Sequence, residues 1–198
     1  MTYGMVINLR RCVGCRACVT ACKGANGTPP TVFRSRVEQV FEGTYPDVTC
    51  HITPMLCMHC ENAPCVEVCP SGASQRGEDG IVTIDKEVCI GCQSCIAACP
   101  YRARSYIESD EGYFGKELTP YEEMRYQAMP VGTVDKCDFC KGNGRLDSGE
   151  VPACAQACLA KARIFGDLDE LKSMIDERDA AQLMPEQGTN PSVYYIPA

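Results

Sequence analysis

The stretch CVGCRACVTACKG, residues 12–24, decides the fold, because it holds four cysteines at close and regular spacing. Two residues separate Cys12 from Cys15 and Cys15 from Cys18, whereas three residues precede Cys22. Three thiolates so close along the chain can wrap one metal centre, and soft thiolate sets select zinc or iron–sulfur clusters. The longer last gap spans about one helical turn, so we expect Cys22 to reach a second site.

The chain has 198 residues and 17 cysteines, and all but one of these cysteines fall into four groups. The groups are Cys12, Cys15, Cys18 and Cys22 (group one); Cys57, Cys60, Cys65 and Cys69 (group two); Cys89, Cys92, Cys95 and Cys99 (group three); and Cys137, Cys140, Cys154 and Cys158 (group four). The remaining Cys50 is expected to be a free, buried thiol that behaves as a small hydrophobe.

The groups form an internal repeat. Group three is group one shifted by a constant 77 positions, and the flanks NLRRCVGC and DKEVCIGC agree. Groups two and four share a C-x-x-C followed by a C-x-x-x-C; the shift is 80 for the first pair and 89 for the second, because group four has a longer loop. The chain therefore reads as a duplication with alternating group types.

The composition of the chain argues against several classes of protein. Hydrophobic residues make up 45% of the chain with the cysteines included, and there is no Trp, so we expect a core held together by a metal or covalent staple. The odd cysteine count, and an N-terminus without a signal-peptide pattern, argue against a disulfide framework. A net charge of −7 argues against a nucleic-acid binder. No apolar run is long enough to span a membrane.

Local patterns predict a mixed fold. The segments YGMVINL (3–9) and GIVTID (80–85) are expected to be short strands, and CIAAC and CAQAC helical turns. Residues 101–136 are expected to form an irregular surface excursion, and a helix is predicted over about residues 168–179. The C-terminal segment LMPEQGTNPSVYYIPA is expected to be extended.

The spacing favours iron–sulfur clusters over zinc. The pattern C-x-x-C-x-x-C-x-x-x-C, often followed by Pro, is typical of two-cluster ferredoxins, in which the fourth cysteine ligates the other cluster. Cys69 and Cys99 precede a proline, whereas Cys22 and Cys158 do not. Group four alone fits a zinc site, but groups one and three would leave a close cysteine unused. A zinc-stapled structural protein is the alternative from another class.

Each two-cluster module needs one group of each type. The connector between Cys69 and Cys89 is short, so groups two and three are expected to form one module, residues 51–109. Groups one and four then form a discontinuous module, residues 1–50 plus 110–198. The predicted fold class is α+β, with two ferredoxin-like two-cluster modules and irregular insertions.

Exchange of the fourth cysteine within each module predicts the ligands of four 4Fe-4S clusters. The sets are Cys12, Cys15, Cys18 and Cys158 (set one); Cys22, Cys137, Cys140 and Cys154 (set two); Cys57, Cys60, Cys65 and Cys99 (set three); and Cys69, Cys89, Cys92 and Cys95 (set four). All four sites would then be complete.

Nearly the whole chain resembles the iron–sulfur electron-transfer subunit of the dimethyl-sulfoxide-reductase superfamily of molybdopterin oxidoreductases, which includes polysulfide, thiosulfate, tetrathionate and arsenate reductases. The motifs that carry the resemblance are YGMVINLRRCVGCRAC, LCMHCENAPCVEVCPSGA, CIGCQSCIAACPY, KCDFC, PACAQAC, ARIFGDLDE and PEQGTNPSVYY. The chain departs from close relatives in the 101–136 insert and in CLAKA, where CP is commoner.

The resemblance implies an electron-transfer subunit with a chain of four clusters and no catalytic site of its own. Its cluster one would face a catalytic subunit with a molybdenum or tungsten pterin cofactor, and cluster four a quinone-linked membrane-anchor subunit or a soluble redox partner. The expected location is the periplasm or the outer face of the cytoplasmic membrane, with the cytoplasm as the alternative. A polyferredoxin-type subunit of a hydrogenase or formate dehydrogenase assembly is the competing function.

Cationic side chains crowd group one: Arg10, Arg11, Arg16 and Lys23. They are expected either to raise the potential of cluster one or two or to form a basic docking patch. His59, inside CMHC, is expected to make a hydrogen bond or to lie at the surface rather than to ligate metal. The aromatic residues Tyr101, Tyr194 and Tyr195 are expected to serve packing or an interface.

Overall fold

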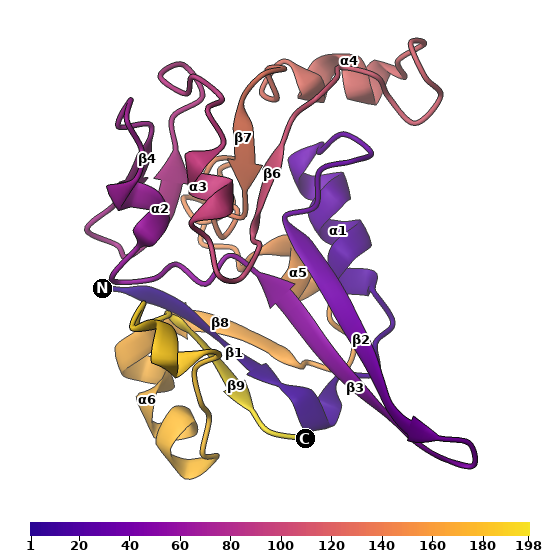
Figure 1. The fold of residues 1–198 in the computed structure, drawn as a ribbon, viewed down its shortest axis with the longest axis vertical. Coiled ribbons are helices and arrows are strands. Elements are labelled where there is room, and N and C mark those ends of the chain that lie inside the picture. The colour runs from indigo at the N-terminus through magenta and orange to yellow at the C-terminus, as the bar shows by residue number, and fades with distance from the viewer.

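A three-stranded sheet places the first strand of the chain next to the last one (Figure 1). In this computed structural model, which describes residues 1–198, β1 (Tyr3–Asn8) pairs antiparallel with β8 (Arg163–Asp167) and parallel with β9 (Val193–Ile196). The helix α6 (Leu168–Glu177) packs its Leu171 against Val6 and Ile196 of this sheet. The predicted first strand and the predicted helix are thus confirmed, although α6 ends two residues earlier than expected.

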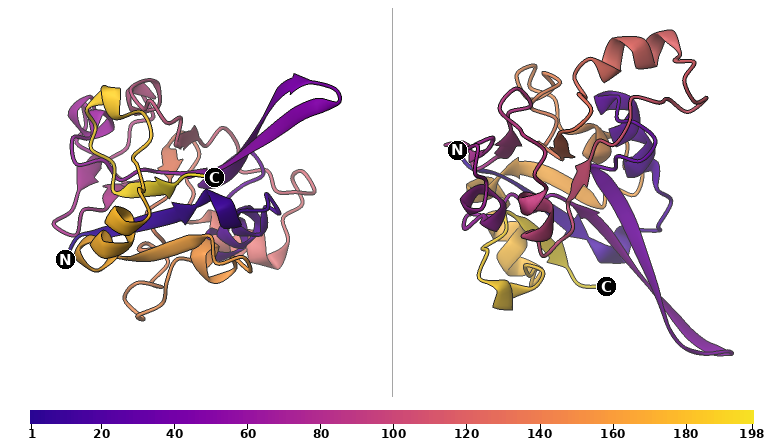
Figure 2. Two further views of the ribbon diagram at one scale, coloured as in Figure 1. Left: turned by 90° about the horizontal axis from the view of Figure 1, so that it is seen from below. Right: turned by 45° about the horizontal axis from the view of Figure 1, so that its top comes forward.

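The remaining strands form three antiparallel pairs. They are β2 (Ser35–Thr44) with β3 (Asp47–Leu56), β4 (Ser74–Arg76) with β5 (Val82–Ile84), and β6 (Arg104–Tyr106) with β7 (Val134–Lys136). The strand β5 confirms the strand predicted in GIVTID. The hairpin of β2 and β3, here called the arm, extends away from the body in both views of Figure 2. Its Phe41 and Tyr45 side chains are exposed.

The arm corrects the expectation for Cys50. This residue lies on β3 opposite Phe41, and it is exposed rather than buried. The physical reason is the length of the hairpin, which carries Cys50 beyond the body of the molecule, where no packed layer covers it.

Each cysteine group forms the same local structure. Its third cysteine is the second residue of a helix: Cys18 in α1 (Ala17–Asn26), Cys65 in α2 (Pro64–Glu67), Cys95 in α3 (Ser94–Ala97) and Cys154 in α5 (Ala153–Gln156). The fourth cysteine follows the helix by two residues in groups two, three and four, whereas the longer α1 contains Cys22. The predicted helical turns are confirmed.

The backbone also repeats between groups one and three. Gly14 and Gly91 have φ of 69° and 67°, and Arg16 and Gln93 have φ of 60° and 61°. These are pairs at the 77-residue shift, and both positions lie in the left-handed region that side chains rarely adopt. The duplication seen in the sequence therefore holds at the level of backbone conformation.

Residues 101–136 are only partly the irregular excursion that was expected. Their ends form β6 and β7, and Tyr101 and Ile107 are fully or almost fully buried, at 2% and 0% exposure. The reason is that β6 leads out of group three and β7 leads into group four, so the pairing of these strands connects two cysteine groups. Between them, α4 (Pro120–Tyr126) begins with a capping box formed by Thr119 and Glu122.

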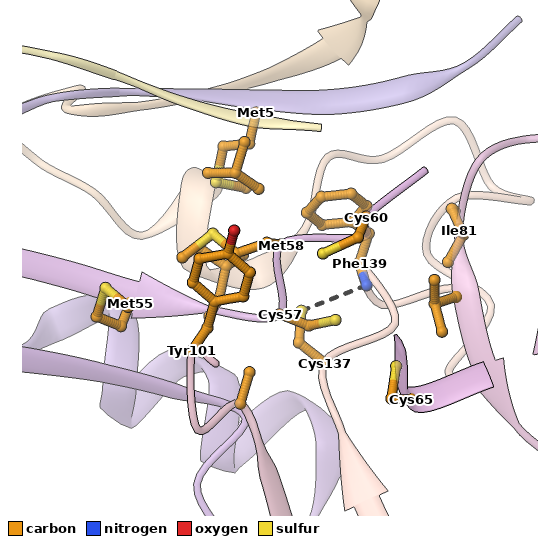
Figure 3. Close-up of a cluster of buried hydrophobic side chains, with 14 of the residues drawn as sticks. Met5, Met55, Cys57, Met58, Cys60, Cys65, Ile81, Tyr101, Cys137 and Phe139 are labelled. Atoms are coloured by element: carbon orange, nitrogen blue, oxygen red, sulfur yellow. Dashed lines mark hydrogen bonds between the residues drawn. The ribbon is translucent and has the colours of Figure 1, made fainter. Parts of the chain in front are cut away.

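One hydrophobic cluster of 21 buried residues joins the parts of the chain (Figure 3). It includes Met5 from the expected first module and Ile81 from the second, together with many cysteines. The boundary expected between residues 50 and 51 falls inside β3, and β6 pairs with β7 across the boundary expected at 109/110. The bounds of the two modules and the assignment of the cysteine groups to them stay a prediction.

Two short 3-10 helices, η1 (Leu9–Arg11) and η2 (Pro185–Gln187), complete the regular structure. No helix reaches the length and apolar character that crossing a membrane requires.

Candidate iron–sulfur sites

The thiols predicted as set one line a single cavity. Cys12, Cys15 and Cys18 come from the loop and first turn before and within α1, and Cys158 follows α5. The cavity is small, and Val37, Pro54 and Ala162 contribute apolar surface to it. The structure therefore brings a cysteine from group four to the three cysteines that begin the chain.

The thiols predicted as set two are all buried. The side-chain amide of Asn26 lies 3.6 Å from the Cys22 sulfur and 3.7 Å from the Cys140 sulfur, so one donor spans groups one and four. Burial raises the pKa of Cys22 to about 12, and negative charge on Cys154 and Cys140 adds to the rise. These mutual effects place Cys22 beside group four.

The thiols predicted as set three influence each other in the same way. Burial raises the pKa of Cys60 to about 12; a hydrogen bond with Thr189 opposes the rise, and charge on the other three thiols adds to it. Those three are Cys57, Cys65 and Cys99. Cys99 comes from group three, so the structure brings the fourth cysteine of that group to group two.

Set four, like set one, has one exposed, two half-buried and one buried thiol. Cys92 is exposed, Cys69 and Cys89 are half-buried, and Cys95 is buried. Burial raises the pKa of Cys69, but hydrogen bonds from the backbone of Ser74 and from Ser71 outweigh it and lower the pKa to about 7. Cys69 is close enough to Cys92 for its charge to act on that thiol.

Backbone N–H groups point at sulfur in several of the sites. The N–H groups of Ser74, Phe139 and Ala162 lie 3.4, 3.4 and 3.2 Å from the sulfurs of Cys69, Cys137 and Cys158. The contact of Phe139 with Cys137 is drawn in Figure 3. Hydrogen bonds of this kind stabilise negative charge on sulfur and tune the potential of an iron–sulfur cluster.

The donor chemistry fits iron–sulfur clusters. Each set offers four thiols, which suit the [4Fe-4S] core, and the four thiols of set one line one cavity. No three His, Cys, Asp or Glu side chains converge in the way that a single bound metal ion requires.

His59 has the hydrogen-bonding role that was expected as one of two possibilities. Its imidazole is fully buried, and Nδ1 accepts a hydrogen bond from the Val82 N–H at 3.0 Å. Burial lowers the pKa of His59 well below its ordinary value, and the nearby cations Lys136 and Arg104 lower it further. The ring is therefore neutral and serves packing.

The three tyrosines also serve packing. The Tyr101 hydroxyl lies 2.7 Å from the Thr189 hydroxyl, and the Tyr195 hydroxyl donates to the Pro54 carbonyl at 2.9 Å. The Tyr194 hydroxyl accepts from the side-chain amide of Gln182. These bonds tie the C-terminal segment to the body of the molecule.

The cations around group one lie at the surface or bond to the backbone. Arg10 donates to the Pro197 carbonyl, Arg16 donates to Gln39, and Arg11 is exposed. Lys23 donates to the carbonyls of Pro29 and Val32.

Three cations are buried near the cysteines and were missed by sequence reasoning: Arg104, Lys136 and Arg163. A signal was present for the two arginines, because each follows the fourth cysteine of its group by five residues, in CPYRAR and CLAKAR. The same offset in both halves of the duplicated chain indicates that Arg104 and Arg163 occupy equivalent positions.

Two family models, each described as a 4Fe-4S dicluster domain, match residues 11–73 and 48–116. These matches reject the zinc alternative for groups one to three. Group four lies outside both ranges.

The relatives cover almost all of the chain. The B subunit of selenate reductase from Mesobacillus selenatarsenatis is 41% identical over 97% of this chain and 70% of its own length. The arsenate respiratory reductase iron–sulfur subunit of Shewanella sp. is 37% identical over 99% and 96%. The B component of polysulfide reductase from Wolinella succinogenes is 39% identical over 98% and 94%. The chain thus belongs to the iron–sulfur B subunits of the dimethyl-sulfoxide-reductase family, binds four 4Fe-4S clusters and transfers electrons.

Proposed function

We propose that the chain relays electrons between a molybdopterin catalytic subunit, with molybdenum or tungsten, and a second redox partner. The relatives support this, since they are named as the B subunits or components of selenate, tetrathionate and polysulfide reductases. The second partner is a quinone-linked membrane-anchor subunit or a soluble carrier. The complex lies at the outer face of the cytoplasmic membrane.

The ligand sets are those expected from the exchanged fourth cysteines. The contact of Asn26 with both Cys22 and Cys140 carries the assignment, because it connects groups one and four at one site. Cys158 of group four lines the same cavity as Cys18 of group one. This supports the reciprocal exchange, in which group four provides a ligand to the cluster of group one.

Electrostatic effects between thiols of different sets support a linear order of the clusters. Beyond the effect of burial, negative charge on Cys18 of set one raises the pKa of Cys154 of set two. Beyond burial, negative charge on Cys57 of set three likewise raises the pKa of Cys137 of set two. Arg104 is close to Cys57 of set three and to Cys95 of set four. The electron path therefore runs from set one through sets two and three to set four.

The variant Cys158→Ser tests the ligand sets. We expect it to perturb or remove the cluster held by Cys12, Cys15 and Cys18 and to leave the cluster of Cys22 intact. Iron and sulfide analysis with electron paramagnetic resonance gives the readout, and Cys50→Ser, on the exposed arm, is the matched control that keeps all four clusters. A loss confined to the cluster of Cys22 would contradict the proposed exchange.

The partner is tested by purifying the chain from its native source under mild conditions. We expect a large subunit that contains molybdenum or tungsten, and protease treatment of intact cells or spheroplasts reports the side of the membrane. A large subunit with neither metal would favour the polyferredoxin function in a hydrogenase-type assembly.

A further inference from the structure

Two arginines are buried among the proposed cluster ligands. Arg104 is 6% exposed and Arg163 is 4% exposed, and neither forms an ion pair with a carboxylate. A buried cation without an opposite charge is strongly unfavourable. Arg104 and Arg163 therefore need a nearby negative charge, and no carboxylate side chain supplies one.

One end of each guanidinium is anchored by a serine. Arg104 donates from Nη1 to the Ser74 hydroxyl at 2.8 Å, and Arg163 donates from Nη2 to the Ser35 hydroxyl at 3.0 Å. Three further guanidinium nitrogens are buried without a hydrogen-bond partner: Nη2 of Arg104, and Nε and Nη1 of Arg163. Unsatisfied buried donors are rare and costly, which marks this side of each guanidinium as facing a partner.

Cysteines of two different sets lie next to each guanidinium. Arg163 lines the cavity of set one, and its charged neighbours are Cys18 of that set and Cys154 of set two. Arg104 has as its neighbours Cys65 and Cys57 of set three and Cys95 of set four. Each arginine thus lies between the two clusters of one module.

Both arginines stay charged, because a guanidinium is not deprotonated in proteins. The five-residue offset of both arginines from a fourth cysteine makes them equivalent devices in the duplicated chain.

We propose that Arg163 raises the reduction potentials of the clusters in sets one and two, and that Arg104 does so for the clusters in sets three and four. Reduction adds one electron, and hence one negative charge, to a cluster. A fixed cation in a buried, weakly screened site stabilises that added charge, and no proton is taken up. The exposed cations around Cys12, by contrast, are screened by water and salt.

This inference rests on the ligand sets proposed above, and its test keeps the two apart. The holoprotein and its variants are titrated with electron paramagnetic resonance at defined potentials. Signals are first assigned with Cys158→Ser, Cys154→Ser, Cys60→Ser and Cys92→Ser, one for each set. A wrong ligand set would show at this stage, before any arginine is changed.

In Arg163→Gln we expect the reduction equilibrium constant of cluster one or two to fall at least tenfold, which is about 59 mV for a one-electron couple. Clusters three and four should keep their potentials. In Arg104→Gln the pattern should be the reverse. The variants Arg163→Lys and Arg104→Lys keep the charge and should recover most of the shift.

Arg11→Gln, at an exposed position beside group one, is the matched control and should leave all potentials unchanged. Iron and sulfide content is measured for every variant. If a glutamine variant does not load its clusters, Ser35→Ala and Ser74→Ala replace it, since they release the anchor and should lower potentials in the same pair of clusters. Unchanged potentials in a fully loaded variant, or an equal shift in all four clusters, would overturn the proposal.

Discussion

The imidazole of His59 stacks on the ring of Phe139, with ring centroids 3.9 Å apart and an interplanar angle of 24°. The two residues hold the same position in the repeated motifs CMHC and CDFC, and both have positive φ, 46° and 52°. The duplicated halves of the chain therefore meet ring to ring at the centre of the molecule. Phe139 also packs edge-on against Phe165 of the three-stranded sheet, at 5.1 Å.

The stack predicts a large loss of stability in Phe139→Ala. The ring is fully buried, and its removal leaves a cavity between the halves, so unfolding should become easier by about 3–5 kcal/mol. Anaerobic guanidinium unfolding, followed by the visible absorbance of the clusters, measures the change. The control Phe114→Ala, at 76% exposure, should stay within about 0.5 kcal/mol of the parent protein. Similar losses of unfolding free energy in both variants would show that the stack of His59 on Phe139 does not stabilise the fold more than an exposed ring does.

Gly14 and Gly91 provide a second matched pair, because they occupy equivalent turns with φ of 69° and 67°. In Gly14→Ala the new methyl group would meet the flexible end of Ile52 at 3.1 Å, so only the left-handed backbone is strained, at about 1–2 kcal/mol. In Gly91→Ala it would collide with the backbone carbonyl of Gly132, which cannot move freely.

We therefore expect Gly91→Ala to lose clearly more stability than Gly14→Ala in the same unfolding assay. It should also weaken iron incorporation in set four, because Gly91 lies between Cys89 and Cys92. Equal losses in the two variants would mean that the turn of group three can shift away from Gly132.

A buried ion pair connects the segment before the arm with group four. The guanidinium of Arg34 binds both carboxylate oxygens of Asp135, at 2.8 and 2.9 Å, and also contacts Asp138 at 3.1 Å. Burial would raise the pKa of Asp135, but Arg34 and Lys86 outweigh it and lower the pKa below its ordinary value. The pair holds β7 in place just before Cys137.

Asp135→Asn should destabilise the protein by about 3 kcal/mol, because Arg34 then keeps only Asp138 and Lys86 loses its carboxylate partner. Glu38→Gln is the control, since its pair with Arg36 is partly exposed and should contribute at most about 1 kcal/mol. The double variant Arg34→Leu, Asp135→Leu should recover part of the loss. A double variant as unstable as the sum of the two single ones would argue that the two side chains act independently.

Residue spacing alone predicted the elements that hold the cysteines. The constant shift between groups, the helical turn after each third cysteine and α6 all follow from local periodicity and are confirmed. The arm was not predicted, because both faces of its outer part are in water and its side chains show no buried alternation, as the exposed Val40, Phe41 and Val48 illustrate. Cys50 was misjudged for the same reason.

The buried arginines show a different limit of the sequence. Arg is mostly exposed, so a charged residue near a cysteine group is first assigned to the surface. That assignment holds for Arg16 but fails for Arg104 and Arg163, whose burial depends on sulfur atoms brought from distant groups. Only the folded arrangement shows which cation has such neighbours.

The capping box of α4 predicts a local effect of pH and charge. The Glu122 carboxylate accepts hydrogen bonds from the N–H groups of Thr119 and Tyr113, both at 2.8 Å, and these bonds lower its pKa from 4.5 to about 2. Because the folded pKa is depressed, this stabilisation is present above pH 4.5 and is lost as the pH falls from 4.5 through about 2.

Glu122→Gln should therefore speed amide hydrogen exchange over residues 112–126 at every pH from about 6 to about 8, and by the same factor, since the parent carboxylate stays ionised throughout. Mass spectrometry of peptides from this segment, corrected for intrinsic exchange, gives the measurement. Glu123→Gln removes an equal charge from an exposed position of the same helix and should have little effect. An effect of Glu122→Gln that vanished toward pH 6 would mean that the carboxylate titrates near neutrality, against the hydrogen bonds that hold it.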